Sequence, residues 1–287
     1  MNFDDALRHY LPRVWFRLRF FKYKYLGRGE PELWLIRHLV RRGTNAVDVG
    51  ASIGIYSTEM ARHAAKVLAF EANPAIAAFM RKVAPRNAEV FNVALSAQAG
   101  RATLSMPQNR KGHPVTELAT LEPSSDPQGS VALEVETRPL DAFAVENCSF
   151  IKIDVEGHEE AVVDGAAALI AAQRPVLMIE LIESFNPGTI ARLTARFAAQ
   201  SYACFFLSKG TLRPAAEFEV TRDQAGSGPD YIANFLFVPA EKRALLPRGL
   251  DRYFWQAGQK KVERVPCTMR LIVPLHFGIG HFVPARS

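Results

Sequence analysis

Four ionisable residues alternate with other residues in one short segment, at Lys152, Asp154, Glu156 and His158. Alternate residues of a strand share one face, so Lys152 and Asp154 fit a predicted strand over residues 150–154, and Glu156 and His158 fit the loop and helix start that follow. Two neighbouring carboxyl groups raise the pKa of one of them, which suits a general base at neutral pH. We therefore predict Asp154 and Glu156 as catalytic residues. His158 is a further catalytic candidate that fits a helix cap equally well, and Lys152 is a catalytic candidate or a structural ion-pair partner.

An apolar segment before residue 50 runs into a turn with the spacing Gly-x-x-x-Gly, from Gly50 to Gly54. Glycine lets the backbone approach a ligand closely, and this spacing differs from the Gly-x-Gly-x-x-Gly of dinucleotide-binding enzymes. Asp48 stands just before the turn, where its carboxylate would reach a ligand amine or hold the loop. The cofactor contacts predicted for this segment are Asp48, Gly50, Ala51, Ser52, Ile53 and Gly54.

A second acid follows at the distance expected for a ribose-binding residue. Glu71 lies 21 residues after Gly50, at the end of the next predicted strand, where a carboxylate accepts hydrogen bonds from ribose hydroxyls. These two features predict a nucleoside-containing cofactor, the alternative being plain turn glycines and a solvated acid. Ala72 and Asn73, directly after Glu71, are further predicted cofactor contacts. Asn92, Val93 and Ala94 form a turn of small residues that fits adenine, and Asp154 is the last predicted contact. Glu180 ends a further strand and is a candidate to orient the substrate or Asp154.

Strands must alternate with helices to bring these segments together. Such alternation is typical of an α/β fold with a parallel sheet, in which ligands bind at the carboxyl ends of the strands. Two short strands, over residues 103–106 and 131–137, break this rhythm, and the polar segment 107–130 between them is a lid-like or disordered loop. The main predicted strands cover residues 46–49, 66–70, 89–93, 150–154, 175–181, 202–207 and 231–238, and the predicted helices cover 31–43, 56–63, 74–83, 159–172 and 189–200.

Charge is distributed unevenly over the 287 residues. The net charge is +6, of which residues 1–28 carry +5 and residues 240–287 carry +6, so the centre is acidic. An acidic centre argues against a nucleic-acid partner, whereas basic ends suit an anionic partner, a membrane surface or solubility. Residues 1–28 mix arginines with aromatic residues and predict an amphipathic helix. That helix either packs on the main domain, which we favour, or makes a peripheral contact with the inner face of a membrane.

The cysteines and the apolar segments bear on location. The three cysteines, Cys148, Cys204 and Cys267, lie far apart, which favours reduced thiols over disulfides or a zinc site. No apolar run reaches the roughly 18 residues of a membrane span. Charged residues interrupt every apolar stretch before residue 30, so we expect no signal peptide there. We expect a cytoplasmic protein.

Taken together, these segments resemble the FkbM family of S-adenosylmethionine-dependent methyltransferases. The string from Lys152 to Glu159 is the most specific part of the resemblance, and Ser52, Ala72 and Ala97 depart mildly from the family pattern. The matching segments are residues 29–32, 47–54, 70–74, 92–96, 139–141, 151–159 and 179–180, with a looser match at 234–239.

The resemblance implies a Rossmann-like class I methyltransferase fold, with helices on both faces of a seven-stranded, mostly parallel sheet whose last strand is antiparallel. It also implies S-adenosylmethionine as cofactor and a hydroxyl acceptor on a sugar, glycan, lipid-linked or secondary-metabolite molecule. The expected organisation is a helical N-terminal extension (1–42), a methyltransferase domain (43–239) and a C-terminal extension (240–287). No ligand spacing demands a metal, although some O-methyltransferases use a divalent cation, which Asp154 and a second acid would hold.

Three other functions fit parts of the pattern. A nicotinamide dehydrogenase would need the missing Gly-x-Gly-x-x-Gly, and a nucleic-acid methyltransferase would need an Asn/Asp-Pro-Pro-aromatic string that the sequence lacks. A protein that binds a nucleoside or tethers a complex without catalysis remains as the alternative, against which Asp154 and Glu156 argue.

Overall fold

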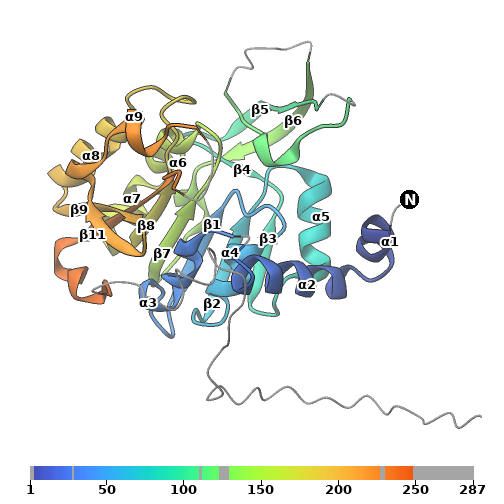
Figure 1. Ribbon diagram of the computed structural model, residues 1–287, viewed down its shortest axis with the longest axis horizontal. Coiled ribbons are helices and arrows are strands. Elements are labelled where there is room, and N and C mark those ends of the chain that lie inside the picture. The colour runs from blue at the N-terminus through green and yellow to red at the C-terminus, as the bar shows by residue number, and fades with distance from the viewer. Residues whose placement is uncertain (1–2, 28, 110–111, 123–128, 227–229, 248–287) are drawn as a thin grey trace, which may run out of the picture.

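Eight strands form the central sheet of the computed structural model, which describes residues 3–27, 29–109, 112–122, 129–226 and 230–247 (Figure 1). The strand order is β3-β2-β1-β7-β8-β11-β9-β10. Strands β3 to β8 in this order pair in parallel, and β11 is antiparallel to both neighbours. The strands are β1 (Asn45–Val49), β2 (Lys66–Phe70), β3 (Ala88–Phe91), β7 (Cys148–Ile153), β8 (Val176–Glu180), β9 (Tyr202–Ser208), β10 (Thr211–Pro214) and β11 (Asn234–Pro239).

This topology confirms the predicted α/β fold with a mostly parallel sheet and an antiparallel strand near the chain end. The sheet has one strand more than the seven expected. The extra strand, β10, forms a hairpin with β9 through Lys209 and Gly210, both with positive φ. Two-residue hairpin loops require this backbone conformation, which Gly adopts easily and Lys adopts rarely. The Lys-Gly pair is therefore a weak turn signal, and β10 was not predicted from the sequence.

A smaller sheet lies beside the carboxyl ends of the central strands (Figure 1). It contains β4 (Ala94–Leu95), β5 (Gly100–Pro107) and β6 (Ser130–Arg138), in the order β4-β6-β5. The two predicted strands at 103–106 and 131–137 fall inside β5 and β6, whereas β4 was expected to be only a turn. The loop between β5 and β6 contains a short 3-10 helix, Thr116–Leu118.

Helices cover both faces of the central sheet, because side chains of one strand alternate between two cores. Val47 and Val49 pack in the core that contains the apolar residues of α6, α7 and α8, whereas Ala46 packs with Ile36 of α3 and Met60 of α4. The helices are α1 (Phe3–Tyr10), α2 (Pro12–Tyr25), α3 (Ile36–Leu39), α4 (Ile55–Met60), α5 (Pro74–Val83), α6 (Glu159–Gly165), α7 (Ala167–Gln173), α8 (Thr189–Ala199) and α9 (Val220–Asp223).

Three predicted helices are interrupted in the structure. Leu11 leaves the helical conformation before Pro12, as a residue that precedes proline usually does, so the N-terminal segment forms α1 and α2. The expected helix over 31–43 is a 3-10 turn, Pro31–Trp34, followed by the short α3, because Val40 is extended. The helix expected over 159–172 breaks between α6 and α7, where Gly165 passes so close to the Ser96 carbonyl that a Cβ would lie 2.1 Å from its oxygen.

Helix α2 packs on the main domain, as the favoured interpretation of residues 1–28 expects. Trp15, Phe16 and Phe20 are buried against Phe79 of α5. The Trp15 and Phe79 rings meet edge to face, with centroids 5.6 Å apart. No helix in the described part of the chain combines the length and the apolar character of a membrane span. Of the C-terminal extension, residues 240–247 are described, and the prediction for 248–287 lies outside the described residues.

Candidate functional site

A cavity of about 580 Å³ opens at the carboxyl ends of β1, β2, β7 and β8. Its volume is typical of a site for a cofactor or small substrate. Fourteen of the residues predicted from the sequence line it: Asp48, Gly50, Ala51, Ser52, Ile53, Glu71, Ala72, Val93, Ala94, Lys152, Asp154, Glu156, His158 and Glu180. The three remaining predicted residues, Gly54, Asn73 and Asn92, do not line the cavity.

Gly50 lets the glycine turn lie directly against the end of β7. Its φ is +74°, and a Cβ at this position would lie 1.7 Å from the carbonyl oxygen of Asp154. Any side chain would therefore separate the turn from Asp154, besides straining the backbone. The turn and the carboxylate segment, which are 100 residues apart in the sequence, form one wall of the cavity for this reason.

Glu71 is tied to the glycine turn by its carboxylate. One oxygen accepts a hydrogen bond from the Ser52 amide at 2.8 Å, and the other accepts one from the Asn73 amide at 2.8 Å. Burial raises the pKa of Glu71 to about 7, against the opposing effect of these two amides. The carboxylate keeps free lone pairs for ribose hydroxyls at this edge of the cavity.

The residues that do not line the cavity have structural roles. Asn73 caps α5, because its side-chain oxygen accepts hydrogen bonds from the amides of Ala75 and Ile76. Asn92 donates its amide to the carbonyls of Glu71 and Ala72, at 2.9 Å each, and so fixes the loop that carries Glu71. Gly54 has a φ of +90° and starts α4. Direct cofactor contact by Gly54, Asn73 or Asn92 stays a prediction.

Asp48 holds the loop rather than projecting freely into the cavity. Its side chain is buried and accepts a short hydrogen bond from the Ser57 hydroxyl of α4. Burial raises its pKa to about 6, while the Ser57 bond and the charge of Lys152 act in the opposite direction. Of the two roles predicted for Asp48, the structure favours the fastening of the turn to α4.

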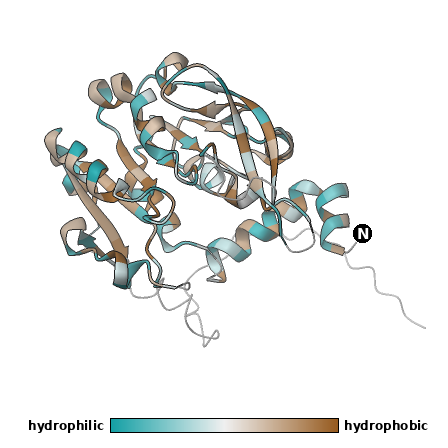
Figure 2. Ribbon diagram, turned by 90° about the horizontal axis from the view of Figure 1, so that it is seen from above, coloured by the Kyte–Doolittle hydropathy of each residue, from teal (hydrophilic) through white to brown (hydrophobic). Residues whose placement is uncertain are grey.

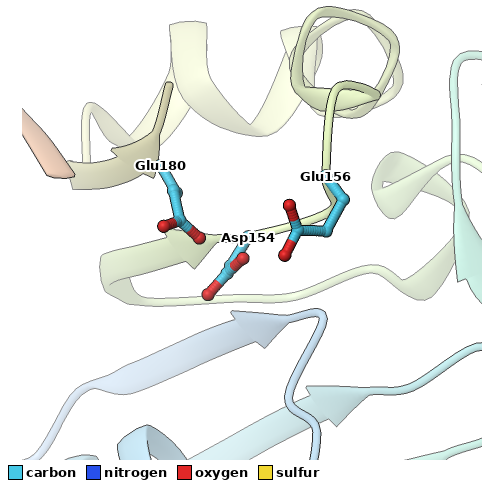
Figure 3. Close-up of side chains that lie close together, drawn as sticks. All are labelled: Asp154, Glu156 and Glu180. Carbon is cyan, nitrogen blue, oxygen red and sulfur yellow. The ribbon is translucent and has the colours of Figure 1, made fainter. Parts of the chain in front are cut away.

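Asp154 and Glu180 face each other across the ends of β7 and β8 (Figure 3). The buried Lys152 ammonium lies 3.2 Å from an oxygen of Asp154. Burial works against ionisation of Asp154, but Lys152 and a hydrogen bond from Glu180 hold its pKa below the usual value. Burial and the charge of Asp154 raise the pKa of Glu180 well above its usual value. These opposite pKa shifts favour the negative charge on Asp154, beside Lys152, and a proton on Glu180.

Glu156 points toward the same pair from the loop after β7 (Figure 3). Burial, followed by the charges of Asp154 and Glu159, raises the pKa of Glu156 to about 8. Its φ is +51°, an uncommon conformation for a residue other than glycine. A residue held in such a conformation at a cavity wall often belongs to a functional site. A carboxyl group with a pKa near 8 is suited to accept a proton close to neutral pH.

The carboxyl oxygens of Asp154, Glu156 and Glu180 lie within 4.8 Å of one another. Oxygen clusters of this kind suit hard cations such as Mg²⁺ or Ca²⁺. Lys152 already places a positive charge beside Asp154, so the cluster has a compensating cation of its own. The prediction that no metal is needed here stays a prediction.

His158 connects the site to the loop between β5 and β6. Its Nδ1 lies 2.7 Å from an Oε1 of Glu122, and its Nε2 lies 2.9 Å from the Ser96 hydroxyl. It occupies the N-cap position of α6 without a side-chain cap bond. Both ring nitrogens have protein partners, so this geometry favours a role in holding the loop over a role as base.

The described part of the predicted 107–130 loop lies against the cavity. Thr116, Ala119 and Leu121 line it, and the Thr120 hydroxyl donates a 2.6 Å hydrogen bond to the carbonyl oxygen of Glu156. Residues 110–111 and 123–128 lie outside the described residues. The described segment therefore has the position of a lid, anchored on the loop that carries Glu156.

Sequence analysis missed a cluster of hydrogen-bonded polar residues around Glu30 at the cavity wall. Glu30 accepts hydrogen bonds from the Tyr23 hydroxyl at 3.0 Å, the Tyr56 hydroxyl at 2.6 Å and the Asn234 amide at 3.0 Å. The Lys152 ammonium lies 5.1 Å from the centroid of the Tyr56 ring. These residues come from four separated parts of the sequence, so no local spacing could have indicated them.

Sequence analysis also missed two cations at the cavity. Arg8 and Arg19 of the N-terminal helices line it, and each guanidinium lies 5.3 Å from the centroid of the Trp15 ring. Neither arginine forms an ion pair with another described residue. The N-terminal helices thus supply a positively charged part of the wall.

The solved structures that are similar to this chain include methyltransferases. The FkbM methyltransferase of Methylobacillus flagellatus KT is 16% identical, with a TM-score of 0.49 over 83% of this chain, and the chain spans 55% of that protein's length. A Streptococcus mutans protein in complex with S-adenosylhomocysteine is 9% identical, with a TM-score of 0.42 over 72% of this chain and 94% of that one. A precorrin-6y C5,15-methyltransferase from Geobacter metallireducens is 12% identical, with a TM-score of 0.41 over 72% of this chain and 86% of that one. No curated protein matches the sequence.

The sequence itself matches a described protein family. The family model for the methyltransferase FkbM domain matches residues 48–202, which are more than half of the chain. The match begins at Asp48 and includes the glycine turn, Glu71 and the carboxylates after β7, all of which line the cavity. The chain therefore belongs to the FkbM family of S-adenosylmethionine-dependent methyltransferases.

Proposed function

We propose that this protein transfers a methyl group to a hydroxyl oxygen of a small-molecule, glycan or lipid-linked acceptor. One observation carries the proposal. Glu156, with a pKa raised to about 8, lies in the same cavity as the glycine turn and Glu71. A hydroxyl must lose its proton when its oxygen is methylated, and a positioned base accelerates that step by about 10²–10⁴-fold.

The residues of the cavity fit S-adenosylmethionine. Gly50 leaves the backbone of the turn open toward the cavity, and the Glu71 carboxylate stands where ribose hydroxyls would donate to it. Val93 and Ala94 provide a small apolar wall for a flat base. When bound, the cofactor supplies a methyl group already activated on a sulfonium sulfur. The chain then has to align the acceptor oxygen with that carbon and remove one proton.

The carboxylates divide these tasks. Glu156 takes the proton from the acceptor hydroxyl, because among Asp154, Glu156 and Glu180 it is the group whose pKa is raised to about 8, whereas the pKa of Asp154 is lowered. Asp154 remains ionised beside Lys152 and orients the acceptor or the cofactor by accepting hydrogen bonds. Lys152 positions Asp154, and His158 holds the lid segment through Glu122.

Transfer of a ¹³C-labelled methyl group tests the proposal. The protein is incubated with methyl-labelled S-adenosylmethionine and separate glycan, lipid and small-metabolite fractions, with Glu156→Gln as the matched control. We expect a carbon signal with the chemical shift of an O-methyl ether that is strongly reduced in the variant. A signal from N-methyl or C-methyl carbon would overturn the hydroxyl assignment. Binding of S-adenosylhomocysteine without transfer to any fraction would favour the non-catalytic, nucleoside-binding alternative.

A further inference from the structure

Helix α2 has two apolar faces, and the domain buries only one of them. Trp15, Phe16 and Phe20 face the domain. The opposite face carries a second stripe, whose members repeat at intervals of three and four residues and so lie one above another on the helix. This outer stripe consists of Leu11, at the start of the helix, and Val14, Leu18, Phe21 and Tyr25, each between 41% and 53% exposed.

The outer stripe belongs to a concentration of exposed apolar side chains at this end of the molecule. Twelve large hydrophobic residues are exposed in the described part of the chain, and eight of them lie between Phe3 and Leu26. Hydrophobic and hydrophilic residues lie side by side along these helices, at the edge of the molecule (Figure 2). Single exposed apolar residues need no explanation, but a contiguous stripe marks an interaction surface.

The charges beside the stripe are all positive. At 100° per residue, Lys22 falls on one side of the stripe and Arg17 on the other, and both are exposed. Neither forms an ion pair with a described residue. Helix α2 contains five basic residues and no acid. This pattern suits a partner with an apolar interior and a negatively charged surface.

We propose that the outer stripe of α2 docks on the surface of an anionic lipid bilayer. A helix with Leu, Phe and Tyr on one face and flanking Arg and Lys lies in the plane of such a surface, with its apolar face in the headgroup boundary and its cations on lipid phosphates. The helix does not cross the bilayer. Its other face remains packed on α5, so the domain follows it to the membrane.

Charge argues against two other partners for the outer stripe, a second copy of this chain and the chain's own C-terminal residues. A second copy of the chain would place Arg17 and Lys22 against the same residues of its partner, without the opposite charges that usually flank such helix pairs. The C-terminal residues 248–287 carry seven basic and two acidic residues, so they too would be repelled. An anionic bilayer is the occupant that complements both the stripe and its flanks.

Docking in this orientation has a consequence for the substrate, which rests on the proposed function. Trp15, Arg19 and Tyr23 of the same helix line the cavity. One face of α2 carries the outer stripe and the opposite face forms part of the cavity wall, so docking would hold the cavity within about one helix diameter, roughly 10–12 Å, of the lipid headgroups. A hydroxyl acceptor on a headgroup that extends past the helix would reach the cavity while its lipid stays in the bilayer.

Vesicle co-sedimentation tests the docking without any methyl transfer. The full chain is sedimented with vesicles of phosphatidylcholine alone and of phosphatidylcholine with phosphatidylglycerol. We expect binding to the anionic vesicles only, and a strong loss of binding when added salt shortens the Debye length from about 10 Å to about 3 Å. Absence of binding to the anionic vesicles would overturn the proposal.

Matched variants locate the docking surface. Leu18→Ser with Phe21→Ser should weaken binding to anionic vesicles by at least about tenfold, because two apolar side chains no longer enter the lipid boundary. Arg17→Gln with Lys22→Gln should weaken it by roughly 25-fold, about fivefold for each cation. The control pair, Val220→Ser with Leu245→Ser, alters apolar residues elsewhere that are 41% and 40% exposed, and it should bind like the wild type.

Two results would contradict this location. One is an equal loss of binding in the control pair. The other is a wild-type dimer, seen by light scattering, that becomes a monomer in Leu18→Ser with Phe21→Ser while vesicle binding is unchanged. The outer stripe would then be the contact with a second copy of the chain. Unchanged thermal unfolding midpoints show that the variants are folded.

Discussion

At the scale of single residues, the environment of Glu156 decides the proposed chemistry. A base acts only when it is deprotonated, and the pKa of Glu156 is raised to about 8. We therefore expect kcat/KM for the acceptor, measured at saturating cofactor, to rise between pH 6 and pH 9 with a midpoint of about 8. Glu156→Gln should lower kcat by about 10²–10⁴-fold and abolish this rise, with little effect on the affinity for S-adenosylhomocysteine. A variant that keeps the wild-type pH profile would exclude Glu156 as the base.

Spacing alone was sufficient to predict that Asp154 and Glu156 lie at one edge of the sheet, because a strand followed by a turn brings such neighbours together. It was not sufficient to decide between the catalytic and the structural role of His158, because its two partners, Ser96 and Glu122, lie 62 and 36 residues away. Nor did it reveal Glu30, one of whose partners lies 204 residues further along the chain. Contacts of this kind depend on tertiary packing, which a single sequence does not display.

At the scale of elements, the contact between the glycine turn and β7 offers a matched pair of substitutions. Gly50 and Gly43 have nearly the same φ, +74° and +75°, but a Cβ would meet Asp154 only at Gly50, and Gly43 has nothing within 4 Å. Gly43→Ala should cost about 1–2 kcal/mol of unfolding free energy from backbone strain alone. Gly50→Ala should cost at least about 2 kcal/mol more and abolish S-adenosylhomocysteine binding. Equal effects in urea denaturation would contradict the assigned close approach.

The lid segment makes a second prediction at this scale. Thr120→Val removes the hydroxyl that donates to the Glu156 carbonyl while keeping the side-chain shape. The same hydroxyl accepts a hydrogen bond from the Glu122 amide at 3.1 Å, so the substitution removes two bonds. Loss of each bond is worth about 0.5–1.5 kcal/mol, so amide hydrogen exchange of residues 116–122 should accelerate by roughly 5–150-fold, with exchange of the central strands unchanged. Unaltered exchange in this segment would mean that other contacts hold the lid.

Elements with local signals were predicted closely. Helix α5 was predicted to the residue, because Asn73 caps it and Pro74 begins it. Strand β2 is a short apolar run after a polar turn, and its bounds also agree with the prediction. Strand β10 and the breaks at Leu11 and Ala166 were missed, since weak turn residues and tertiary contacts determine them.

At the scale of the whole molecule, the cavity depends on parts of the chain that the predicted domain borders separate. Residues 1–42 were expected to be an extension, yet Trp15, Arg19 and Tyr23 line the cavity together with residues of β1 and β7. The basic charge of the N-terminus was visible in the sequence, whereas its place at the cavity was not. The domain borders themselves stay a prediction.

The central claim is that this cavity binds the adenosyl cofactor, with Glu71 on its ribose. Calorimetric titration with S-adenosylhomocysteine tests it most directly, because that ligand needs no acceptor, and NAD serves as the control ligand. Only ionised Glu71 accepts two ribose hydrogen bonds, and its pKa is raised to about 7. The affinity should therefore fall as the pH drops below 7, and Glu71→Gln should weaken binding by about 10–100-fold at pH 8.

We predict micromolar binding of S-adenosylhomocysteine to the wild type and no binding of NAD. Folded wild-type protein that binds neither ligand, or a Glu71→Gln variant with unchanged affinity and pH dependence, would contradict the account.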